Sequence, residues 1–446
     1  MDCIVIGGGL SGLASAVWLA EKGHQVTLLE RRGALGGRTI SIPQEEVNDV
    51  PDNGQHVFAS GFEHLMNYLE SVGTRQYVAF PGQMTVRLPG GGTRISAFGG
   101  LEGLRAMLGD LPGVKGLDKV RTAIAQTKLM RDVLFPPKDI DSLTADQWLQ
   151  RIGMPETARL ALWDGIVIGL TGDKPTLSSA RVPIDLLRTG IRQARKFKQP
   201  ISIGYPTTDL DTLYVKSAEQ TFARLGVKVR TRAPVAKVNI EQGALKGVTL
   251  LDGEFIAADA VISAVPVWQL KGLLEDLPEK ARYEQAVEAL KPVPIVSVNY
   301  YFDRDIGMQD WGEILLGGEG VLEQIWDRQR MHGRKPNPHY FFSTTVSASY
   351  ELIHGSNAEI VAQQLAMIHR YFPESRRAKL VHSHIVRMPT STIRQAPGSK
   401  GVRPPQKTSV PRFAVAGDWT DTDWTITMEG ACQSAQRAVQ AVLADA

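Results

Sequence analysis

The stretch CIVIGGGLSGLASAVWLAEKGHQVTLLE, from Cys3 to Glu30, decides how this chain of 446 residues folds. It begins with an apolar run typical of a buried strand, continues through three consecutive glycines into a helix of small residues, and ends in a second β-type run. A strand, a glycine turn, a helix and another strand form a parallel βαβ unit. The stretch therefore predicts an α/β fold.

The glycines of this turn have the spacing of a dinucleotide-binding fingerprint. Gly7 permits the tight turn, Gly9 lets the backbone approach a pyrophosphate, and Gly12 lets the helix pack closely on the strand. The N-terminus of the helix then faces the phosphates. Glu30 stands at the end of the second strand, where its carboxylate can accept hydrogen bonds from both ribose hydroxyls of an adenosine. The fingerprint predicts a Rossmann-like domain, but it does not separate NAD from FAD.

A second glycine motif follows the fingerprint. Gly36 and Gly37 allow a loop to lie against the dinucleotide, and Arg38 supplies a charge-assisted donor for a phosphate. The run GGRTIS, which starts at Gly36, resembles the second glycine motif of the flavin amine oxidase and carotenoid desaturase superfamily. The resemblance implies FAD as the cofactor, with the arginine over its pyrophosphate. In that superfamily a Pro-Val pair places its valine backbone against adenine, and Val235 follows Pro234 in this way.

The composition indicates a globular protein with several cooperating units. A length of 446 residues suggests two or three such units, and 43% hydrophobic residues can form a sizeable core. The net charge of +3 is too small to indicate a nucleic-acid partner. The two cysteines, Cys3 and Cys432, have neither metal-ligand nor disulfide spacing, so we predict no metal site and expect a reducing compartment. The apolar run begins almost at Met1 and no membrane span is visible, so we expect a cytoplasmic protein.

The rest of the chain predicts two interleaved domains. Residues 227–266 are typical of strands, with a hairpin that turns at Asp252-Gly253 and a buried strand after it. Residues 83–97 also have a hairpin-like pattern. We expect a discontinuous FAD-binding domain of the amine oxidase and glutathione reductase type, comprising residues 1–80, 200–270 and 396–446. The interleaved substrate-binding domain comprises residues 81–199 and 271–395.

The C-terminal stretch GDWTDTDWTITMEGA, from Gly417 to Ala431, lies between a short strand and a helix. Asp418 follows the strand, where its carboxylate can accept hydrogen bonds from the hydroxyls of a ribitol chain. The helix begins near Thr427 and Met428, and its free N–H groups can stabilise the negative charge that a reduced flavin carries at N1 and C2=O. We interpret the stretch as the floor of an isoalloxazine site. A core helix with a threonine-rich first turn is the alternative.

Motifs along almost the whole chain resemble those of the squalene-associated FAD-dependent desaturases. The stretches that carry the resemblance are DNGQHVF (52–58), LWDGIVIGLTGDKPTLSSA (162–180), PIVSVNYYFDR (294–304), RPPQKTSVPRFAVAGDWT (403–420) and the C-terminal motif. The characterised activity of that family is hydroxysqualene dehydroxylation in hopanoid pathways. The resemblance implies that an allylic alcohol on a C30 chain loses water and gains hydride from FADH2, which gives squalene.

The implied chemistry requires three features. The flavin N5 must be held against the allylic carbon, an acid must help hydroxide leave, and a dry pocket must keep water away from an allylic cation. The candidate acids are His56, Asp421 and Asp423. In the superfamily the loop with the pattern D-x-G-x-x passes beside the flavin ring, which favours His56. The alternatives are that His56 is a hydrogen-bonded structural residue and that the two aspartates stabilise turns of the loop.

A C30 substrate also implies contact with a membrane. Each CH2 contributes roughly 0.8 kcal/mol to the free energy of transfer out of water, so the substrate must pass directly from a bilayer into the protein. Residues 181–198 carry six basic side chains and one acid, Asp185. Four apolar residues of this stretch share a helical face: Ile184, Leu187, Ile191 and Ala194. This pattern is typical of a helix that binds anionic headgroups at the inner face of the cell membrane, although an ordinary surface helix fits equally well.

Three other functions fit parts of the pattern. A desaturase of phytoene or another carotenoid precursor would use oxidised FAD to take hydride and would pass the electrons to a quinone. A flavin amine oxidase fits less well, because no lysine can be placed beside the flavin. No cysteine stands where a covalent link to the flavin would be expected, so we expect FAD to bind non-covalently. A flavin-free prenyl carrier, like the Rab escort proteins, would not need the intact glycines, Glu30 and Asp418. The sequence has one dinucleotide fingerprint, so it does not indicate a separate nicotinamide site. The electron donor of the flavin is therefore unknown.

Overall fold

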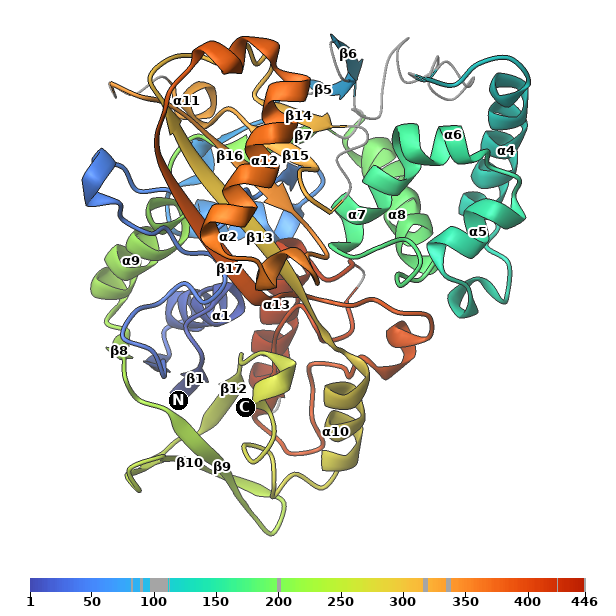
Figure 1. Ribbon diagram of the computed structural model, residues 1–446. Coiled ribbons are helices and arrows are strands. Elements are labelled where there is room, and N and C mark those ends of the chain that lie inside the picture. Colours follow the sequence, from blue (N-terminus) through green and yellow to red (C-terminus); the bar gives the residue numbers. More distant parts are fainter. Residues whose placement is uncertain are drawn as a thin grey trace.

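The computed structural model describes residues 1–81, 83–88, 91–96, 111, 113–198, 202–315, 320–333, 338–422 and 424–444. Asp423, one of the candidate acids, lies outside these residues. The described chain forms three main parts: a parallel sheet with its helices, a larger second sheet, and a unit made of helices (Figure 1).

The first part is built on a five-stranded parallel sheet. Its strands have the spatial order β18, β12, β1, β2 and β8, and every neighbouring pair runs parallel. Their bounds are Asp2–Ile6 (β1), Gln25–Leu29 (β2), Lys228–Arg230 (β8), Ala260–Ser263 (β12) and Phe413–Val415 (β18). All five strands come from residues 1–80, 200–270 and 396–446. The predicted α/β fold with a Rossmann-like beginning is confirmed.

The first and last helices of the chain pack together beside this sheet. They are α1 (Leu10–Glu21) and α13 (Met428–Ala444). Helix α1 is buried along nearly its whole length because its residues are small or apolar. The Ser11 hydroxyl donates to the Ala431 carbonyl at 3.0 Å and fixes the crossing of the two helices. Helix α13 begins where the sequence predicted, and its apolar positions are buried.

A small antiparallel sheet leads the chain back to β12. Its strands are Val235–Glu241 (β9), Ala244–Leu250 (β10) and Phe255–Ala257 (β11). The predicted turn at Asp252-Gly253 joins β10 to β11, and Gly253 has a φ of 93°, which a side chain would strain. This hairpin prediction is confirmed.

A seven-stranded sheet forms the second part, with the order β17, β13, β16, β15, β14, β5 and β6. Its strands are Gln83–Leu88 (β5), Gly91–Ser96 (β6), Pro292–Phe302 (β13), Gly312–Leu315 (β14), Gln324–Trp326 (β15), Tyr340–Val346 (β16) and Leu380–Ile393 (β17). The predicted hairpin of residues 83–97 is confirmed as β5 and β6. Val296, Val298 and Tyr300 of β13 point to an apolar core under helix α12, Asn357–Tyr371 (Figure 1). The opposite face carries hydroxyl and amide side chains such as Ser297, Asn299 and Thr345, together with the aromatic side chains of Tyr301, Phe341 and Trp326. We call it the polar face for its hydroxyl and amide groups.

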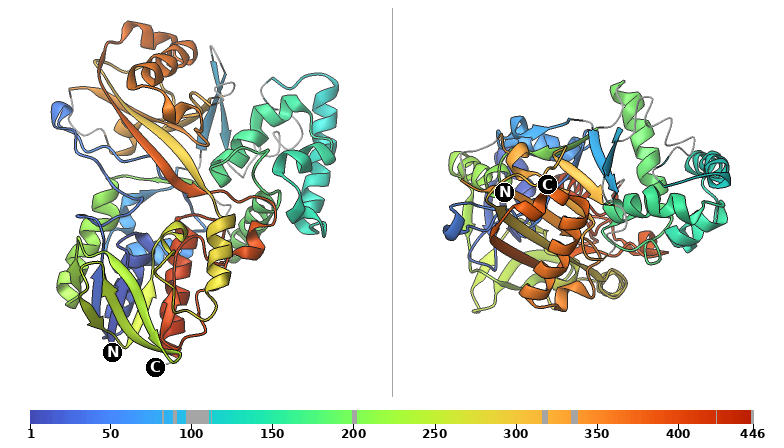
Figure 2. Two further views of the ribbon diagram at one scale, coloured as in Figure 1. Left: turned by 60° about the horizontal axis from the view of Figure 1, so that its bottom comes forward. Right: turned by 45° about the horizontal axis from the view of Figure 1, so that its top comes forward.

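The third part is a unit of helices that projects to one side of the sheets (Figure 2). Its helices are Leu117–Leu134 (α4), Ala145–Arg151 (α5), Glu156–Ala158 (α6), Asp164–Thr171 (α7) and Arg181–Phe197 (α8). Leu129, Trp148 and Ile184 form the centre of its own core. None of the described helices combines the length and apolar character needed to cross a bilayer.

Short elements connect the three parts. The helices are Glu63–Ser71 (α2), Ser217–Leu225 (α9), Lys280–Ala289 (α10) and Arg328–Met331 (α11). The strands Phe58–Ala59 (β3), Val78–Ala79 (β4) and Ile203–Pro206 (β7) form a small antiparallel sheet. Ile203 of β7 packs with Trp326 and Ile314 of the seven-stranded sheet. Phe58 of β3 and Val78 of β4 belong to the core of the five-stranded sheet, so these elements join the two larger sheets.

Helix α8 corresponds to the predicted basic amphipathic segment, but its apolar face is used inside the protein. Ile184, Leu187 and Ile191 pack into the core of the helical unit. Arg181 pairs with Asp185 four residues further along. The apolar residues that the sequence analysis assigned to a membrane surface therefore hold the helical unit together.

The contact between α1 and β1 predicts the effect of replacing Gly12. A Cβ atom at this position would lie 1.8 Å from the carbonyl oxygen of Gly7, so the helix and strand would have to separate. We expect Gly12→Ala to reduce the free energy of unfolding by at least about 2 kcal/mol, as measured by urea denaturation. Gly401→Ala is the matched control, because nothing lies within 4 Å of its added Cβ. Equal stability of the two variants would contradict the prediction.

Candidate functional site

The two glycine motifs meet and form one cradle. The Gly36 N–H donates to the Gly8 carbonyl at 2.8 Å, and Gly9 and Gly36 pair as an isolated parallel bridge. A Cβ on Gly37 would lie 3.0 Å from the Gly9 Cα, closer than real Cβ atoms normally approach. Gly7 and Gly36 have φ values of 102° and 105°. Glycine is therefore needed on both sides of the contact, and bare backbone lines the place predicted for a pyrophosphate.

Glu30 stands beside this cradle at the end of β2. One carboxylate oxygen accepts from the Gly8 N–H at 2.7 Å, and the other accepts from the Arg32 N–H at 2.7 Å. The Glu30 carbonyl accepts from the Ala233 N–H at 2.9 Å, which brings the start of β9, with Val235, toward this end of the sheet. The structure therefore gathers the residues predicted for the adenosine half of a dinucleotide.

Arg38 and Asp418 form an ion pair, although 380 residues separate them in the sequence. The Arg38 Nη2 lies 2.8 Å from each carboxylate oxygen of Asp418. The Nη1 of the same arginine donates to the Ser391 carbonyl at 3.1 Å. The residues predicted to hold the pyrophosphate and the ribitol therefore lie side by side. This arrangement fits a bound dinucleotide that continues from the glycine cradle toward α13.

The start of α13 carries the group predicted for the flavin ring. The Thr427 hydroxyl accepts from the Gly430 N–H at 3.3 Å, as a capping residue does, and Met428 is the first helical residue. Upstream, the Gly417 N–H donates to the Ser434 hydroxyl at 2.8 Å. These bonds fix the C-terminal loop on the helix and leave other N–H groups of the first turn without partners inside the helix.

His56 lies against this helix start. Its Nδ1 is 3.1 Å from the Met428 sulfur, and the Tyr214 hydroxyl lies 3.2 Å from the same sulfur. The structure thus joins His56 to the predicted isoalloxazine floor. The sequence analysis missed Tyr214, because the stretch around it has no glycine or charge pattern that marks a cofactor site.

Burial changes the chemistry available to His56. Desolvation, with a smaller contribution from the positive charge of Arg38, lowers its pKa from 6.5 to about 4. The ring is therefore neutral at neutral pH and can donate or accept one hydrogen bond at each nitrogen. The sequence analysis named His56 as a candidate acid with a structural histidine as the alternative, and a lowered pKa favours the neutral ring over the cation that would donate a proton.

Asp52 is a second titratable group on the same loop. Burial raises its pKa from 3.8 to about 6, although Arg328 and two hydrogen bonds favour the charged form. Its Oδ1 accepts from the Ser41 hydroxyl at 2.7 Å and from the Leu210 N–H at 2.9 Å. The sequence analysis quoted this loop but did not assign Asp52, because burial was the deciding factor and only the fold reveals it.

Asp421 and Glu429 of the C-terminal stretch make contacts away from this group. The side chain of Asp421 is exposed, and its main chain bonds to Pro404 and Gln406. In the described part of the chain, no hydrogen bond links its carboxylate to the group around Met428. The neighbouring Glu429 is buried and accepts from the His64 and Leu65 N–H groups at 3.0 and 2.8 Å, so it clamps α2 to α13. These contacts favour a structural role for both acids.

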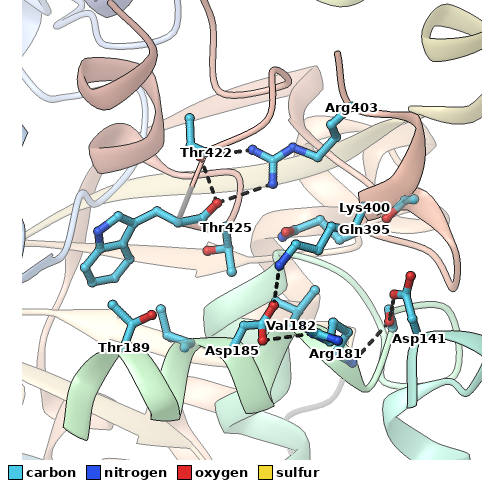
Figure 3. Close-up of a pocket in the computed structure, with 14 residues that line it drawn as sticks. Asp141, Arg181, Val182, Asp185, Thr189, Gln395, Lys400, Arg403, Thr422 and Thr425 are labelled. Atoms are coloured by element: carbon cyan, nitrogen blue, oxygen red, sulfur yellow. Dashed lines mark hydrogen bonds and ion pairs between the residues drawn. The ribbon is translucent and has the colours of Figure 1, made fainter. Parts of the chain in front are cut away.

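A small pocket lies where the C-terminal loop meets α8 (Figure 3). The space between its lining residues is about 490 Å3 when the solvent-open mouth is included. Asp185 bridges Arg181 and Lys400 on one side of it. On the other side Arg403 donates to the carbonyls of Trp424 and Asp418 at 3.3 and 3.0 Å. Burial lowers the pKa of Arg403 to about 10, so it stays charged at neutral pH and holds the loop that carries Asp418.

The polar face of the seven-stranded sheet lies against the loop that carries His56. The Asn299 side-chain amide donates to the Asp52 carbonyl at 3.4 Å, and a Cβ on Gly54 would lie 3.1 Å from the Ser297 hydroxyl. On this face Ser297 pairs with Thr345 across β13 and β16, and Asn299 pairs with Ser343. Four buried polar atoms of the face have no hydrogen-bond partner among the described residues: Ser297 Oγ, Ser343 Oγ, Thr345 Oγ1 and Trp326 Nε1.

Comparison with known proteins identifies the family of this chain. The model of the flavin containing amine oxidoreductase family matches residues 10–443, so the chain belongs to that family. The fold and site accordingly define a flavin-dependent oxidoreductase.

Curated relatives and solved structures match along the whole chain. The chain is 25% identical over 460 residues to 15-cis-phytoene desaturase of Solanum lycopersicum, covering 100% of this chain and 78% of that protein. It is 24% identical over 462 residues to 15-cis-phytoene desaturase of Synechococcus elongatus, covering 100% and 96%. The crystal structure of an oxidoreductase from Methanosarcina mazei superposes with a TM-score of 0.76 at 18% identity, covering 99% of this chain and all of that one.

The contacts of Glu30 predict a loss of flavin when its carboxylate is removed. Glu30→Ala leaves the Gly8 and Arg32 N–H groups without their acceptor and removes the proposed ribose ligand. We expect the dissociation constant of the flavin to rise at least roughly tenfold, measured by fluorescence during reconstitution of the apoprotein. Glu254→Ala is the control, because this residue holds an exposed ion pair with Arg230. Normal flavin affinity in Glu30→Ala would rule out the ribose assignment.

The low pKa of His56 predicts a pH-dependent stability. Folding depresses this pKa, so the contribution of His56 is complete above pH 6.5 and is lost as the pH falls through about 4. In the FAD-free protein we expect this loss to be roughly 1 to 3 kcal/mol, seen as the difference in unfolding free energy between wild type and His56→Gln.

Asp52 contributes with the opposite sign and must be separated from His56. Its raised pKa stabilises the fold below pH 3.8, and this contribution is lost as the pH rises through about 6. Because Asp52 is present in wild type and in His56→Gln, its effect cancels in the difference. A difference that does not change between pH 6.5 and 4 would show that His56 is not held neutral by the fold.

Proposed function

We propose that the protein binds FAD non-covalently and catalyses the reductive dehydroxylation of a C30 allylic alcohol, hydroxysqualene, to squalene. The dinucleotide form of the flavin is supported by Glu30, Arg38 and Asp418, which follow one another from the adenosine end to the ribitol end. The substrate is supported by the squalene-associated motifs along the sequence. On this proposal the protein belongs to squalene and hopanoid biosynthesis.

The observation that carries this proposal is the set of unpaired polar atoms on the face beside the His56 loop. Each buried hydroxyl or N–H without a partner costs about 1 to 3 kcal/mol. A hydrocarbon such as phytoene has no group that could bond to them. An allylic alcohol brings an oxygen that can accept from Ser343 or Trp326 and donate to Thr345. The polar face therefore favours a substrate with a hydroxyl group over a pure hydrocarbon.

The proposed reaction breaks one C–O bond and forms one C–H bond. When bound, reduced FAD supplies the hydride, and the hydroxyl group takes a proton and leaves as water. The first turn of α13 and Met428 would support the flavin ring, and the neutral His56 would stay beside it without adding a positive charge.

Asp52 is the group best suited to hold the proton, because its pKa of about 6 keeps part of it protonated near neutrality. Its Oδ1 is occupied by Ser41 and Leu210, so any proton transfer would use the other oxygen, which lies 3.8 Å from Arg328. The hydroxyls of the polar face would orient the leaving group. Activity should then decrease as the pH rises through about 6.

The proposal also concerns the surroundings of the enzyme. Its partners would be a lipophilic isoprenoid and a membrane surface, and we place it in the cytoplasm at the inner face of the cell membrane. The donor that reduces the flavin is not identified by the site.

A desaturase of phytoene or a related carotenoid precursor is the second candidate. It is favoured by the similarity to 15-cis-phytoene desaturases, which covers the whole chain. In that reaction the oxidised flavin would accept hydride from the substrate. The two candidates therefore require opposite redox states of the flavin, and this difference separates them in an experiment.

The test uses the purified holoprotein without oxygen. We expect that hydroxysqualene added to the reduced protein restores the absorbance of oxidised flavin and yields one squalene for each flavin. Oxidised protein mixed with phytoene is the comparison. If phytoene bleaches the oxidised flavin and hydroxysqualene does not reoxidise the reduced flavin, the protein is a desaturase and the dehydroxylase proposal is wrong.

Neighbouring threonines on β16 test the role of the polar face. Thr345 points to this face with an unpaired hydroxyl, whereas Thr344 points to the other face and donates to Gln364 at 2.8 Å. We expect Thr345→Val to lower kcat/KM for hydroxysqualene roughly tenfold while stability stays the same or rises. Thr344→Val should lose about 1 kcal/mol of stability and keep its activity. Unchanged activity in Thr345→Val would contradict the role of this face.

A further inference from the structure

The outward side of helix α4 carries large apolar residues that the fold does not cover. Leu117, Val120, Ile124 and Phe135 have relative exposures of 72%, 58%, 52% and 76%. Their spacings of three, four and eleven residues keep them on one face of a helix with 3.6 residues per turn. Phe135 directly follows the last residue of the helix. On the same face Lys128 and Arg131 lie between Ile124 and Phe135. We call the four apolar side chains the α4 stripe.

The opposite side of α4 already supplies the contacts that the fold needs. Ala125, Leu129 and Val133 are buried in the core of the helical unit together with Trp148. Helix α4 lies at the outer edge of that unit, away from both sheets (Figures 1 and 2). The α4 stripe therefore contributes little to folding, and its exposure leaves apolar surface in contact with water.

The charges around the α4 stripe are positive. Lys115, Lys128 and Lys138 are exposed, and they form no ion pair with other residues in the described part of the chain. The acids near the stripe are already compensated by arginines. They pair as Asp118 with Arg121, Asp132 with Arg131, and Asp139 with Arg151, at 3.3, 2.7 and 2.8 Å. An apolar stripe flanked by uncompensated lysines is complementary to a bilayer with anionic headgroups.

Helix α8 does not offer the same combination. Its apolar residues are inside the helical core, and two of its cations are engaged by Asp185 and Glu63. A helix can enter an interface only with apolar side chains that its own fold has left free. The lipid-facing surface is therefore expected on α4 instead of residues 181–198.

We propose that the α4 stripe docks on the surface of an anionic phospholipid bilayer. The side chains of Leu117, Val120, Ile124 and Phe135 enter the boundary between headgroups and acyl chains, and the neighbouring lysines contact the headgroups. This inference deepens the proposed function, because it names the surface through which a lipid-soluble substrate is delivered. The docking itself is measured without turnover.

The experiment measures binding of the purified holoprotein to vesicles by sedimentation. Vesicles of phosphatidylcholine alone are compared with vesicles that also contain phosphatidylglycerol. We expect the variant with Leu117→Ser and Ile124→Ser to lose at least roughly tenfold in partition coefficient. The variant with Lys115→Gln and Lys128→Gln should lose affinity roughly fivefold for each lysine, on the anionic vesicles only.

A control with equal exposure separates this surface from general stickiness. Leu251 and Phe255 flank the turn between β10 and β11 and have relative exposures of 73% and 52%. Leu251→Ser with Phe255→Ser should leave vesicle binding unchanged. Flavin content and melting temperature are measured for every variant, so that a loss of binding is not confused with a loss of fold.

Any of three vesicle-binding outcomes would overturn the inference. They are wild-type protein that does not bind anionic vesicles, binding that survives Leu117→Ser with Ile124→Ser, and binding that is lost with Arg188→Gln and Arg195→Gln on α8 instead. Self-association through the α4 stripe would appear in light scattering as a larger mass that Leu117→Ser with Ile124→Ser abolishes. That result would also overturn the inference, because the stripe would then bind a second copy of the chain and not a bilayer. Turnover of detergent-dispersed hydroxysqualene tests the proposed function separately from docking.

Discussion

The close approach of main chain at the two glycine loops is the constraint on which the flavin site depends. Gly36 bonds to the carbonyl of Gly8, and Gly12 packs so near Gly7 that a methyl group has no room. Because no side chains intervene, backbone N–H groups can line the place predicted for a pyrophosphate. The bond from the Gly8 N–H holds Glu30 at a fixed distance from the cradle. Arg38 is held close to the cradle as well, because it directly follows Gly37 of the second loop.

The C-terminal loop completes the site from the other end of the chain. Arg403 is buried, and its bonds to three carbonyls and a hydroxyl hold the loop in place. Asp418 can then meet Arg38, and α13 can begin beside His56. A buried guanidinium is stable here because both of its terminal nitrogens donate hydrogen bonds, and the carboxylates of Asp421 and Asp418 favour its charge. The fixed loop thus depends on one cation, to which the sequence analysis assigned no role although it quoted the stretch that begins with it.

The seven-stranded sheet contributes a different property on each of its faces. One face is an ordinary apolar core under α12, and the other presents hydroxyls and amides toward the loop of Asp52 and His56. The alternation of side chains along β13 and β16 produces this division. Burial of this loop lowers the pKa of His56 and raises the pKa of Asp52. The protonation states of both groups therefore depend on how the fold buries one loop between β13 and the start of α13.

The sequence by itself determined the α/β fold, the glycine cradle, the Glu30 and Asp418 positions and the start of α13, because turns, strand periodicity and helix ends depend on local residues. It did not determine the protonation state of His56, the contacts of Tyr214, the structural role of Asp421, or which helix leaves apolar side chains in water. Desolvation, long-range pairing and the burial of one helix face depend on residues that are distant in sequence. Only the tertiary structure decides which of them meet.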